Sequence, residues 1–303
     1  SNTTPSNLVA SALSVAENEL IGTVVGEVNA TDPDAGATLT YSLVSGVGDG
    51  NNSLFTLESN GTLKTSVTFD YESNASTYAI RVESRDDYNA TVEGNFTVAL
   101  TDVNESPLIT SDGGGATASL SAAENQTAVS TVTGSDPDAG AVLSYSITGG
   151  ADQAKFQVDG VTGVLTFLSA PDYENPTDTG ADNGYEVTVR ASDGTLHDEQ
   201  TITITVTDVN EPPSITSDGA GATASLSVAE NQTAVTTVTA SDPDAGAVLS
   251  YSITGGADQA KFQVDGVTGV LTFLSAPDYE NPTDTGADNG YEVTVRASDG
   301  TLH

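Results

Sequence analysis

The chain has 303 residues, with seven Lys and Arg against 43 Asp and Glu and a formal net charge of −36. A charge of this size and sign excludes nucleic acid and anionic membranes as partners and favours cations, cationic surfaces or neutral polymers. The absence of cysteine also excludes disulfide bridges and thiolate metal ligands.

Motifs recur along the chain in a fixed order with a period of 102 to 107 residues. Ala-Glu-Asn begins at Ala16, Ala123 and Ala229; Asp-Pro-Asp-Ala-Gly at Asp32, Asp136 and Asp242; Asp-Tyr-Glu at Asp70, Asp172 and Asp278; and Asp-Val-Asn-Glu at Asp102 and Asp208. This period is too long for a solenoid unit and suits an independent domain. We therefore expect three domains: a first repeat (1–107), a second repeat (108–213) and a third repeat (214–303).

Short runs within each repeat alternate apolar with polar residues. Examples are LSYSI at 143–147, YEVTV at 185–189 and TITITVT at 201–207. A period of two predicts strands with one buried face, and clusters of Gly, Asp, Asn and Pro separate them. The sequence therefore predicts an all-β fold, with tandem Greek-key β-sandwich domains of the immunoglobulin-like type arranged as an elongated rod.

The second and third repeats are nearly identical. Residues 111–197 and 217–303 differ at four of 87 positions, which suits a spacer better than an enzyme, whereas the first repeat is diverged and carries an Asn- and Gly-rich stretch at 48–52. The second repeat continues beyond His197 into a strand and a linker, and the sequence has no counterpart after His303. We expect the third domain to lack its last strand and to expose an unpaired sheet edge.

The acidic residues fall in clusters. Calcium takes six to eight oxygen ligands, preferably carboxylates, and Asp-x-Asp and Asp-x-Glu are spacings that a strand would point in one direction. One such pair alone is more simply read as a turn before proline. Acidic motifs recurring together in a fixed order favour calcium, and general solubility or adaptation to salt is the alternative.

The sequence resembles tandem cadherin repeats, of the kind also found in large bacterial surface adhesins. The similarity covers the whole chain and is carried by VLSYSI, by the Phe of KFQVDGVTG, by Asp-Tyr-Glu in place of the family's Asp-Arg-Glu, and by the linker Asp-Val-Asn-Glu-Pro-Pro. The resemblance implies cadherin-type domains with calcium between successive domains, three ions in the usual pattern. Glu105 and Glu211 stand where the family usually has Asp, and Ser106 and Pro212 replace its second Asn.

Matching positions gives the metal ligands that the resemblance implies. At the first junction they are Glu17, Asp70, Glu72, Asp102, Asn104, Glu105, Asp136, Asp138 and Asp193. At the second junction they are Glu124, Asp172, Glu174, Asp208, Asn210, Glu211, Asp242, Asp244 and Asp299. Partial sites hold Asp32, Asp34 and Asp86 at one end of the chain and Glu230, Asp278 and Glu280 at the other. These residues include 22 of the 43 acids, and their mutual repulsion without calcium should leave the linkers flexible.

These features predict an extracellular, non-enzymatic fragment of a cell-adhesion protein in which calcium stiffens the repeats into an extender. The alternative is a module that itself binds a partner protein, like or unlike, or a polysaccharide, with 48–52 of the first repeat as the candidate surface. His197 and His303 occupy the one histidine position and lack a catalytic partner motif, and Tyr71, Tyr173 and Tyr279 are expected to pack near the junctions. No apolar run approaches the length of about 18 residues that spans a membrane, so direct membrane insertion is not expected. No signal sequence is recognisable either, and we expect the chain to be a fragment of a longer protein.

Overall fold

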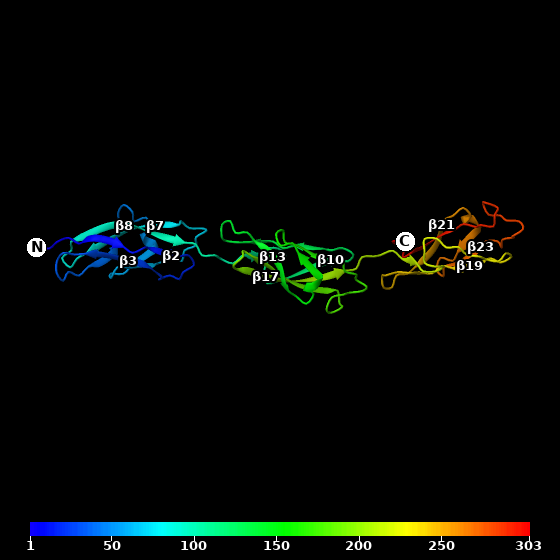
Figure 1. Ribbon diagram of the computed structural model, residues 1–303, viewed down its shortest axis with the longest axis horizontal. Coiled ribbons are helices and arrows are strands. Elements are labelled where there is room, and N and C mark those ends of the chain that lie inside the picture. Colours follow the sequence, from blue (N-terminus) through cyan, green and yellow to red (C-terminus); the bar gives the residue numbers. More distant parts are fainter. The chain divides into compact units, whose positions relative to one another are not determined.

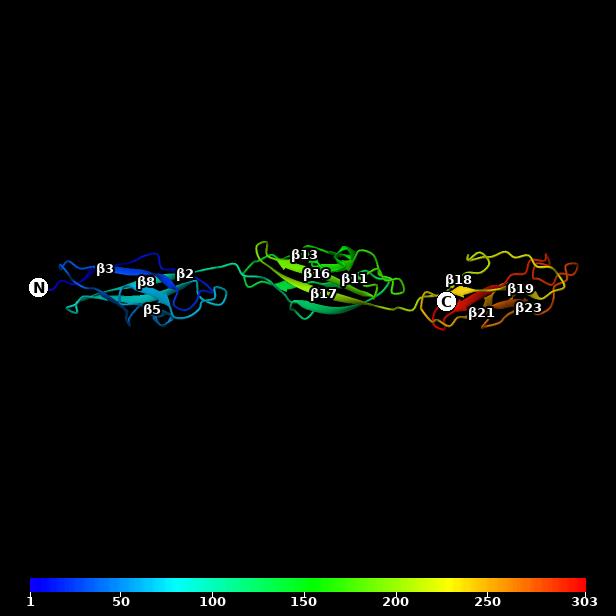
Figure 2. The same ribbon diagram turned by 90° about the horizontal axis from the view of Figure 1, so that it is seen from below.

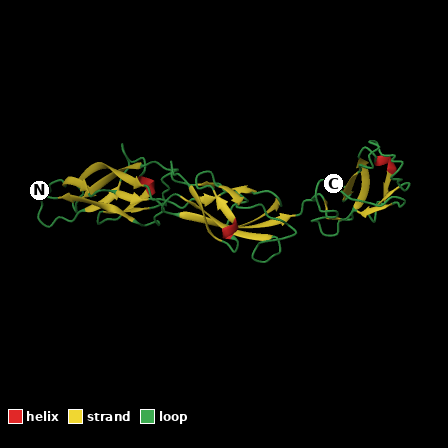
Figure 3. Cartoon of the chain, turned by 45° about the vertical axis from the view of Figure 1, so that its right-hand side comes forward, coloured by secondary structure: helices red, strands yellow, loops and turns green.

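In a computed structural model, which describes residues 1–303, strands and turns make up the chain apart from three short 3-10 helices (Figure 3). Two compact units are formed, one by residues 1–111, 133–145 and 190–199 and the other by residues 112–132, 146–189 and 200–303. The division passes through the second repeat, so each unit contains one whole linker and the acidic residues on both sides of it. No helix is long and apolar enough to cross a membrane.

The first repeat is a sandwich of two four-stranded sheets (Figure 1). Its elements are β1 (Ser6–Ala10), β2 (Ser14–Ala16), β3 (Val24–Thr31), β4 (Thr40–Leu43), η1 (Asn52–Leu54), β5 (Phe55–Leu57), β6 (Thr62–Thr65), β7 (Thr77–Arg85) and β8 (Thr91–Thr101). The sheets have the orders β1-β3-β6-β5 and β2-β8-β7-β4, and β2 runs parallel to β8. Val28 and Leu63 from one sheet and Ile80 and Val98 from the other have no exposed surface, because alternate side chains of each strand point between the sheets.

The second repeat has the same apolar alternation. Its elements are β9 (Leu108–Ile109), β10 (Thr117–Ala123), β11 (Ala128–Thr131), β12 (Gly134–Ser135), β13 (Ser144–Gly149), η2 (Gln153–Lys155), β14 (Phe156–Val158), β15 (Val164–Phe167), β16 (Gly184–Ser192) and β17 (His197–Thr207). The predicted strands at 143–147, 185–189 and 201–207 therefore correspond to β13, β16 and β17, with β13 starting one residue later than its run. The sheet order is β10-β17-β16-β13, with a three-stranded sheet β11-β15-β14 and the pair β12-β9.

Strand β17 is the centre of this repeat's apolar packing. Ile202, Ile204 and Val206 are 0%, 0% and 1% exposed, while the threonines between them face outward. The strand lies parallel to β10, with Leu120 opposite Ile204 and Ala122 opposite Val206. The pairing of β10 with β17 thus brings together two strands from opposite ends of the repeat.

The third repeat has fewer strands than the second (Figure 2). Its elements are β18 (Ser214–Ile215), β19 (Ala234–Thr237), β20 (Ala240–Ser241), β21 (Ser250–Gly255), η3 (Gln259–Lys261), β22 (Phe262–Val264), β23 (Val270–Phe273) and β24 (Thr294–Ser298). No strand follows β24 in residues 299–303, and residues 223–229, which correspond to β10, form no strand. Leu226 and Val228 are 48% and 37% exposed as a result.

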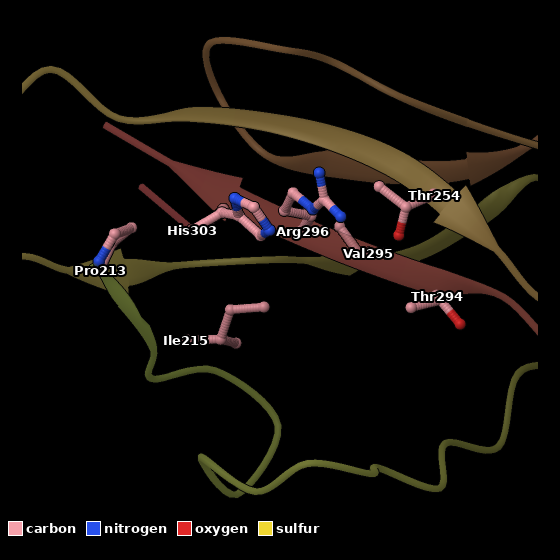
Figure 4. A pocket seen from close by; sticks show the side chains of 8 residues that line it. Pro213, Ile215, Thr254, Thr294, Val295, Arg296 and His303 are labelled. Atoms are coloured by element: carbon pink, nitrogen blue, oxygen red, sulfur yellow. The ribbon is translucent and has the colours of Figure 1, made fainter. Parts of the chain in front are cut away.

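The open edge of the third repeat is marked by a hollow beside β24 (Figure 4). Its walls are Pro213, Ile215, Thr254, Thr294, Val295, Arg296, Ala297 and His303. Strand β24 pairs with β21 in a two-stranded sheet, whereas the corresponding β16 of the second repeat lies between β13 and β17. The hollow therefore adjoins the edge on which a strand equivalent to β17 would pair.

Candidate metal centres

Tight turns bring the carboxylates of each Asp-Pro-Asp motif together. The main-chain N–H of Asp138 donates to Oδ1 of Asp136 at 2.9 Å, and Asp244 and Asp242 repeat this bond at 3.0 Å. These residues lie outside the strands. The expectation that a strand-like spacing aligns the two carboxylates is therefore wrong for this motif, and a side chain accepting from the backbone two residues on aligns them instead.

The glutamate of the Ala-Glu-Asn motif is buried in the first two repeats, where it joins two segments. Oε1 of Glu17 accepts from the N–H of Val103 at 2.9 Å, and Oε2 accepts from the N–H of Tyr71 at 2.6 Å. Glu17 is 2% exposed. One carboxylate thereby holds the Asp-Tyr-Glu turn and the linker at fixed positions at the end of the first repeat.

The second junction repeats this arrangement. Oε1 of Glu124, which is 3% exposed, accepts from the N–H of Val209 at 2.8 Å, and Oε2 accepts from the N–H of Tyr173 at 2.8 Å. These two hydrogen bonds are equivalent to those of Glu17, about one repeat further along the chain. The N–H groups of Tyr71 and Tyr173 thus lie at the junctions, and the Tyr71 side chain packs against the core of the first repeat, whereas Tyr173 and Tyr279 are 37% and 65% exposed.

The linkers contact the repeat that follows them. The N–H of Glu105 donates to Oδ2 of Asp138 at 2.9 Å, and Nδ2 of Asn104 donates to Oδ2 of Asp193 at 2.7 Å. In the second linker the N–H of Glu211 donates to Oδ2 of Asp244 at 2.9 Å, and Nδ2 of Asn210 donates to Oδ2 of Asp299 at 2.6 Å. Residues far apart in the sequence therefore meet at the linkers, as the resemblance implies.

Carboxylate oxygens converge at both junctions. Groups of three residues with ligand atoms within 4.8 Å of one another are Glu17, Glu72 and Asp102; Glu72, Glu105 and Asp138; and Asp136, Asp138 and Asp193 at the first junction. The second junction has Glu124, Asp172 and Glu174, together with Glu174, Asp208 and Asp244. Because the groups share members, each junction offers a continuous set of oxygens rather than isolated acids.

The partial site of the first repeat contains two residues that the sequence interpretation missed. Nδ2 of Asn2 donates to Oδ2 of Asp86 at 2.8 Å, and the N–H of Thr3 donates to Oδ2 of Asp34 at 2.6 Å. These bonds repeat those made by the two linkers, and the N–H of Asp34 also donates to Oδ1 of Asp32 at 2.7 Å. A shared Asn-x-x-Pro spacing, which recurs at Asn2, Asn104 and Asn210, would have revealed the correspondence.

The other acidic positions are more open. In the third repeat Glu230, Asp278 and Glu280 are exposed, although Oε2 of Glu230 still accepts from the N–H of Tyr279 at 2.9 Å. Asp70 is exposed, and its Oδ1 accepts from the N–H of Ser73 at 3.0 Å. The third-repeat set thus keeps the bond between the glutamate and the Asp-Tyr-Glu turn.

The junction carboxylates receive no basic partner. The four ion pairs of the chain join Lys64 to Glu58, Arg81 to Glu93, Arg85 to Glu83 and Arg190 to Glu199, and none includes a predicted ligand. Negative charge therefore accumulates at the junctions without protein countercharge.

This accumulation changes the acidity of individual groups. Desolvation raises the pKa of Glu72, and the charges of Glu17, Glu105 and Asp102 raise it further. Desolvation likewise raises the pKa of Asp102, followed by the charge of Asp138. In the second junction the pKa values of Glu174 and Asp208 are raised in the same way, by desolvation first and by neighbouring carboxylates second.

Hydrogen-bond donors have the opposite effect at the edge of each junction. The N–H of Thr195, the amide of Asn104 and the N–H of Leu196 together lower the pKa of Asp193. The N–H of Thr301 and the amide of Asn210 lower the pKa of Asp299 similarly. These two aspartates are held in the ionised form that a cation needs.

A cation fits these junctions because it would satisfy oxygens that the protein leaves without partners. Seven carboxylate oxygens are buried and accept no hydrogen bond: Asp32 Oδ2, Glu105 Oε2, Asp136 Oδ2, Glu174 Oε2, Glu211 Oε2, Asp242 Oδ2 and Asp244 Oδ1. All seven belong to residues of the predicted ligand set. A buried carboxylate oxygen without a partner is costly, and a hard divalent ion with oxygen ligands removes that cost.

Other sequence signals have structural explanations. Asn51 and Asn52 of the 48–52 stretch are half-buried, and their Oδ1 atoms accept from the N–H groups of Ala79 and Arg81, each at 2.9 Å. Their side chains therefore hold the loop against β7 instead of pointing to a ligand. His197 is exposed at the start of β17, and the hollow that His303 lines contains no acidic side chain.

The sequence matches the family model described as Cadherin domain over residues 11–101, 117–207 and 224–303. The chain belongs to the cadherin family. It is an all-β chain of three tandem cadherin domains, and the family assignment agrees with the expectation of a non-enzymatic protein. The matched ranges include β2 and β10, which are followed directly by the buried Glu17 and Glu124, and the turns that carry the paired acids.

Relatives of the chain are much longer than it is. Protocadherin Fat 1 of Homo sapiens is 30% identical over 300 residues, covering 95% of the chain and 6% of that protein. Cadherin EGF LAG seven-pass G-type receptor 2 of Homo sapiens is 29% identical over 306 residues, covering 94% of the chain and 10% of the receptor. The chain thus spans about a tenth or less of these curated relatives. They are animal proteins and give no support to a bacterial origin.

Solved cadherin structures have the same fold. The crystal structure of mouse Cadherin-23 EC22-24 is 26% identical with a TM-score of 0.56, covering 99% of the chain and 94% of that structure. Human CDH23 EC21-23 has a TM-score of 0.61 at 22% identity, covering 97% of the chain and 99% of that structure, a likeness that shows the fold alone.

Proposed function

We propose that the chain is an extracellular segment of a cell-adhesion protein whose junctions bind calcium, and that calcium fixes each pair of adjacent domains relative to one another. The observation that carries this proposal is the set of seven buried carboxylate oxygens without hydrogen-bond partners, six of them in the two junctions and one, Asp32 Oδ2, in the partial site of the first repeat. The full ligand sets are those predicted above for the first and second junctions, and domain boundaries near 107 and 213 follow from where the linkers lie.

Charge balance explains why the ion would control the junction. Each complete junction gathers eight acidic residues and no basic one, so divalent ions supply the only strong countercharge. Two like charges about 4 Å apart repel by about 1 kcal/mol in water and by more at a protein surface. Calcium-free junctions should therefore separate, and calcium-loaded junctions should hold linker and both repeats together.

The affinity should match an extracellular role. Extracellular calcium modules bind with dissociation constants of about 10⁻⁴ to 10⁻³ M. Sites of this strength fill outside cells and stay empty in a cytosol. We also propose that the segment comes from a large surface adhesin, bacterial or otherwise. The lack of cysteine and the near-identical repeats support this origin.

Spin labels placed on neighbouring repeats test the proposal directly. Because the chain has no cysteine, Val47→Cys with Val161→Cys labels the first junction uniquely, and Val161→Cys with Val267→Cys labels the second. These valines are 86%, 84% and 83% exposed, so the labels leave the cores intact. We expect narrow distance distributions in millimolar calcium and broad ones after chelation, with magnesium as the control ion.

A junction variant supplies the matched control. Asp102→Asn with Asp138→Asn removes two carboxylates of the first junction and leaves the second junction unchanged, so only the first distance should stay broad in calcium. Equal widths with and without calcium at both junctions in the unmodified chain would refute the proposal.

Direct binding of a partner protein or a polysaccharide remains the alternative prediction. Asn52 forms hydrogen bonds within the repeat through both Nδ2 and Oδ1, and Asn51 does so through Oδ1, which leaves Nδ2 of Asn51 as the side-chain amide group without an internal hydrogen bond in this pair.

A further inference from the structure

The asparagine of each Ala-Glu-Asn motif adopts an uncommon backbone conformation. The φ angles of Asn18, Asn125 and Asn231 are 61°, 61° and 64°. Asparagine is among the few residues other than glycine that enter this left-handed region readily. The N–H of each residue is fixed as well, with bonds of 2.8 to 2.9 Å to the carbonyls of Phe69, Pro171 and Pro277. The backbone thus presents the side-chain amide at an equivalent place in all three repeats.

In the two complete junctions this amide binds the linker glutamate. Nδ2 of Asn18 donates to Oε1 of Glu105 at 2.6 Å, and Nδ2 of Asn125 donates to Oε1 of Glu211. The second oxygen of each glutamate, Oε2, is buried and has no partner. The amide therefore occupies one carboxylate oxygen and leaves the other free for a ligand.

The linker glutamate also faces the other acids of its junction. Its ligand oxygen lies within 4.8 Å of those of Glu72, from the preceding repeat, and Asp138, from the following one. The N–H of Glu105 donates to Oδ2 of Asp138. Glu105 is thereby held at two points, its side chain by Asn18 of the preceding repeat and its N–H by Asp138 of the following repeat.

We propose that Asn18 and Asn125 are positioning residues that make glutamate, rather than aspartate, the effective ligand at linker positions 105 and 211. Glutamate has one more rotatable bond than aspartate, and fixing it costs conformational entropy. A hydrogen bond from the amide to the ionised carboxylate offsets that cost and sets which oxygen meets the ion. Aspartate is one methylene shorter and would not reach the amide. This inference rests on the proposed calcium function.

Glycine substitution removes the amide while keeping the backbone angle, because glycine adopts positive φ without strain. The test compares Asn18→Gly with Asn125→Gly against Asn231→Gly, whose parent residue has the same φ angle and no linker glutamate to bind. Calcium is titrated by calorimetry. We expect the junction variants to bind about 3- to 10-fold more weakly, since one hydrogen bond to a charged group at a partly exposed site is lost. The control Asn231→Gly should leave the isotherm unchanged.

A double-mutant cycle separates positioning from a general structural role. In the background Glu105→Asp with Glu211→Asp, the asparagine substitutions should change calcium affinity less than about 2-fold, because the shorter carboxylate has no bond to lose. In calcium-free protein the carboxyl ¹³C signals of Glu105 and Glu211 should also shift when the amide is removed.

The possible failures are distinguishable. An equal loss of affinity in the glutamate and aspartate backgrounds, or no loss in the glutamate background, overturns the positioning role while leaving calcium binding intact. Absence of calcium binding by the unmodified chain overturns the proposed function and this inference together.

Discussion

Adding a strand to the third repeat tests how far its folding depends on the partner that β17 provides in the second repeat. The perturbation appends a copy of residues 198–211 after His303. Because 111–197 and 217–303 differ at four of 87 positions, the added segment meets nearly the same surface that β17 meets in the second repeat. We expect it to pair with β24 and to restore a strand over 223–229.

The magnitude follows from what β17 buries. Ile202, Ile204 and Val206 are almost completely buried, and full burial of such a side chain contributes about 1.5–3 kcal/mol, so that their copies would contribute roughly 5–9 kcal/mol as an upper estimate. Ordering the added residues offsets part of this gain. A net rise of about 2–4 kcal/mol in the unfolding free energy of the third repeat is large against the 5–15 kcal/mol of a typical domain.

Hydrogen exchange read by mass spectrometry measures the effect in place. Val228 replaces Ala122, so peptides from 223–229 and from 117–123 differ in mass and can be followed separately. In the unmodified chain the third-repeat peptide should exchange much faster, since its residues form no strand, whereas 117–123 pairs with β17. The added segment should slow its exchange toward that of the second repeat.

A control segment keeps the composition and shifts the register. Exchanging each Ile or Val of the copied TITITVT with the threonine after it turns the apolar side chains to the opposite face of the strand. This control should give no protection. Equal exchange of the two peptides in the unmodified chain, or equal protection by both added segments, would refute the reasoning.

Three further predictions follow from the junctions and turns. Calcium affinity should fall as pH drops from neutral toward about pH 4–5, because the pKa values of Glu72, Asp102, Glu174 and Asp208 are raised in the calcium-free fold and these groups take up protons that compete with the ion. For the same reason the calcium-free fold should gain stability relative to the unfolded chain as pH falls through this window. Calorimetry at several pH values measures whether both changes have the expected direction. Glu124→Ala should lower the unfolding free energy by about 1–3 kcal/mol even with a chelator present, since the N–H groups of Val209 and Tyr173 lose their acceptor, and an unchanged denaturant midpoint would contradict this. Gly150→Ala should lower the melting temperature of the second repeat clearly more than Gly194→Ala. Both glycines have a positive φ, 100° and 102°, but a Cβ at Gly150 would lie 2.5 Å from the carbonyl oxygen of Glu186, whereas a Cβ at Gly194 would lie in open space.

The strands were predictable where a period of two was strong and the chain was buried on one face. TITITVT and YEVTV correspond to β17 and β16 because alternate Ile, Val and Tyr side chains fill the core between sheets. The loss of strand at 223–229 was not predictable from local pattern, since the same residue types form β10 in the second repeat. It depends on a parallel pairing with a segment some 80 residues away, which no local period reveals.

The set of acidic residues was predictable from the sequence, but the neighbouring residues that hold these acids in place were not. The resemblance to cadherin repeats assigned Glu17, Asp102 and Asp138 to one junction, and the structure brings their oxygens together in overlapping groups. The roles of Asn18 and Asn2 stayed hidden because a single polar residue in a turn is ordinary in any chain. Their function is visible only in the bonds that they make to residues 84 or more positions away.

The acidic residues of each junction come from equivalent positions in the repeat before it and the repeat after it. No single repeat therefore contains a complete set of junction residues. Adding or removing one whole unit of about 106 residues would therefore bring the same set of acidic residues together wherever the remaining units meet.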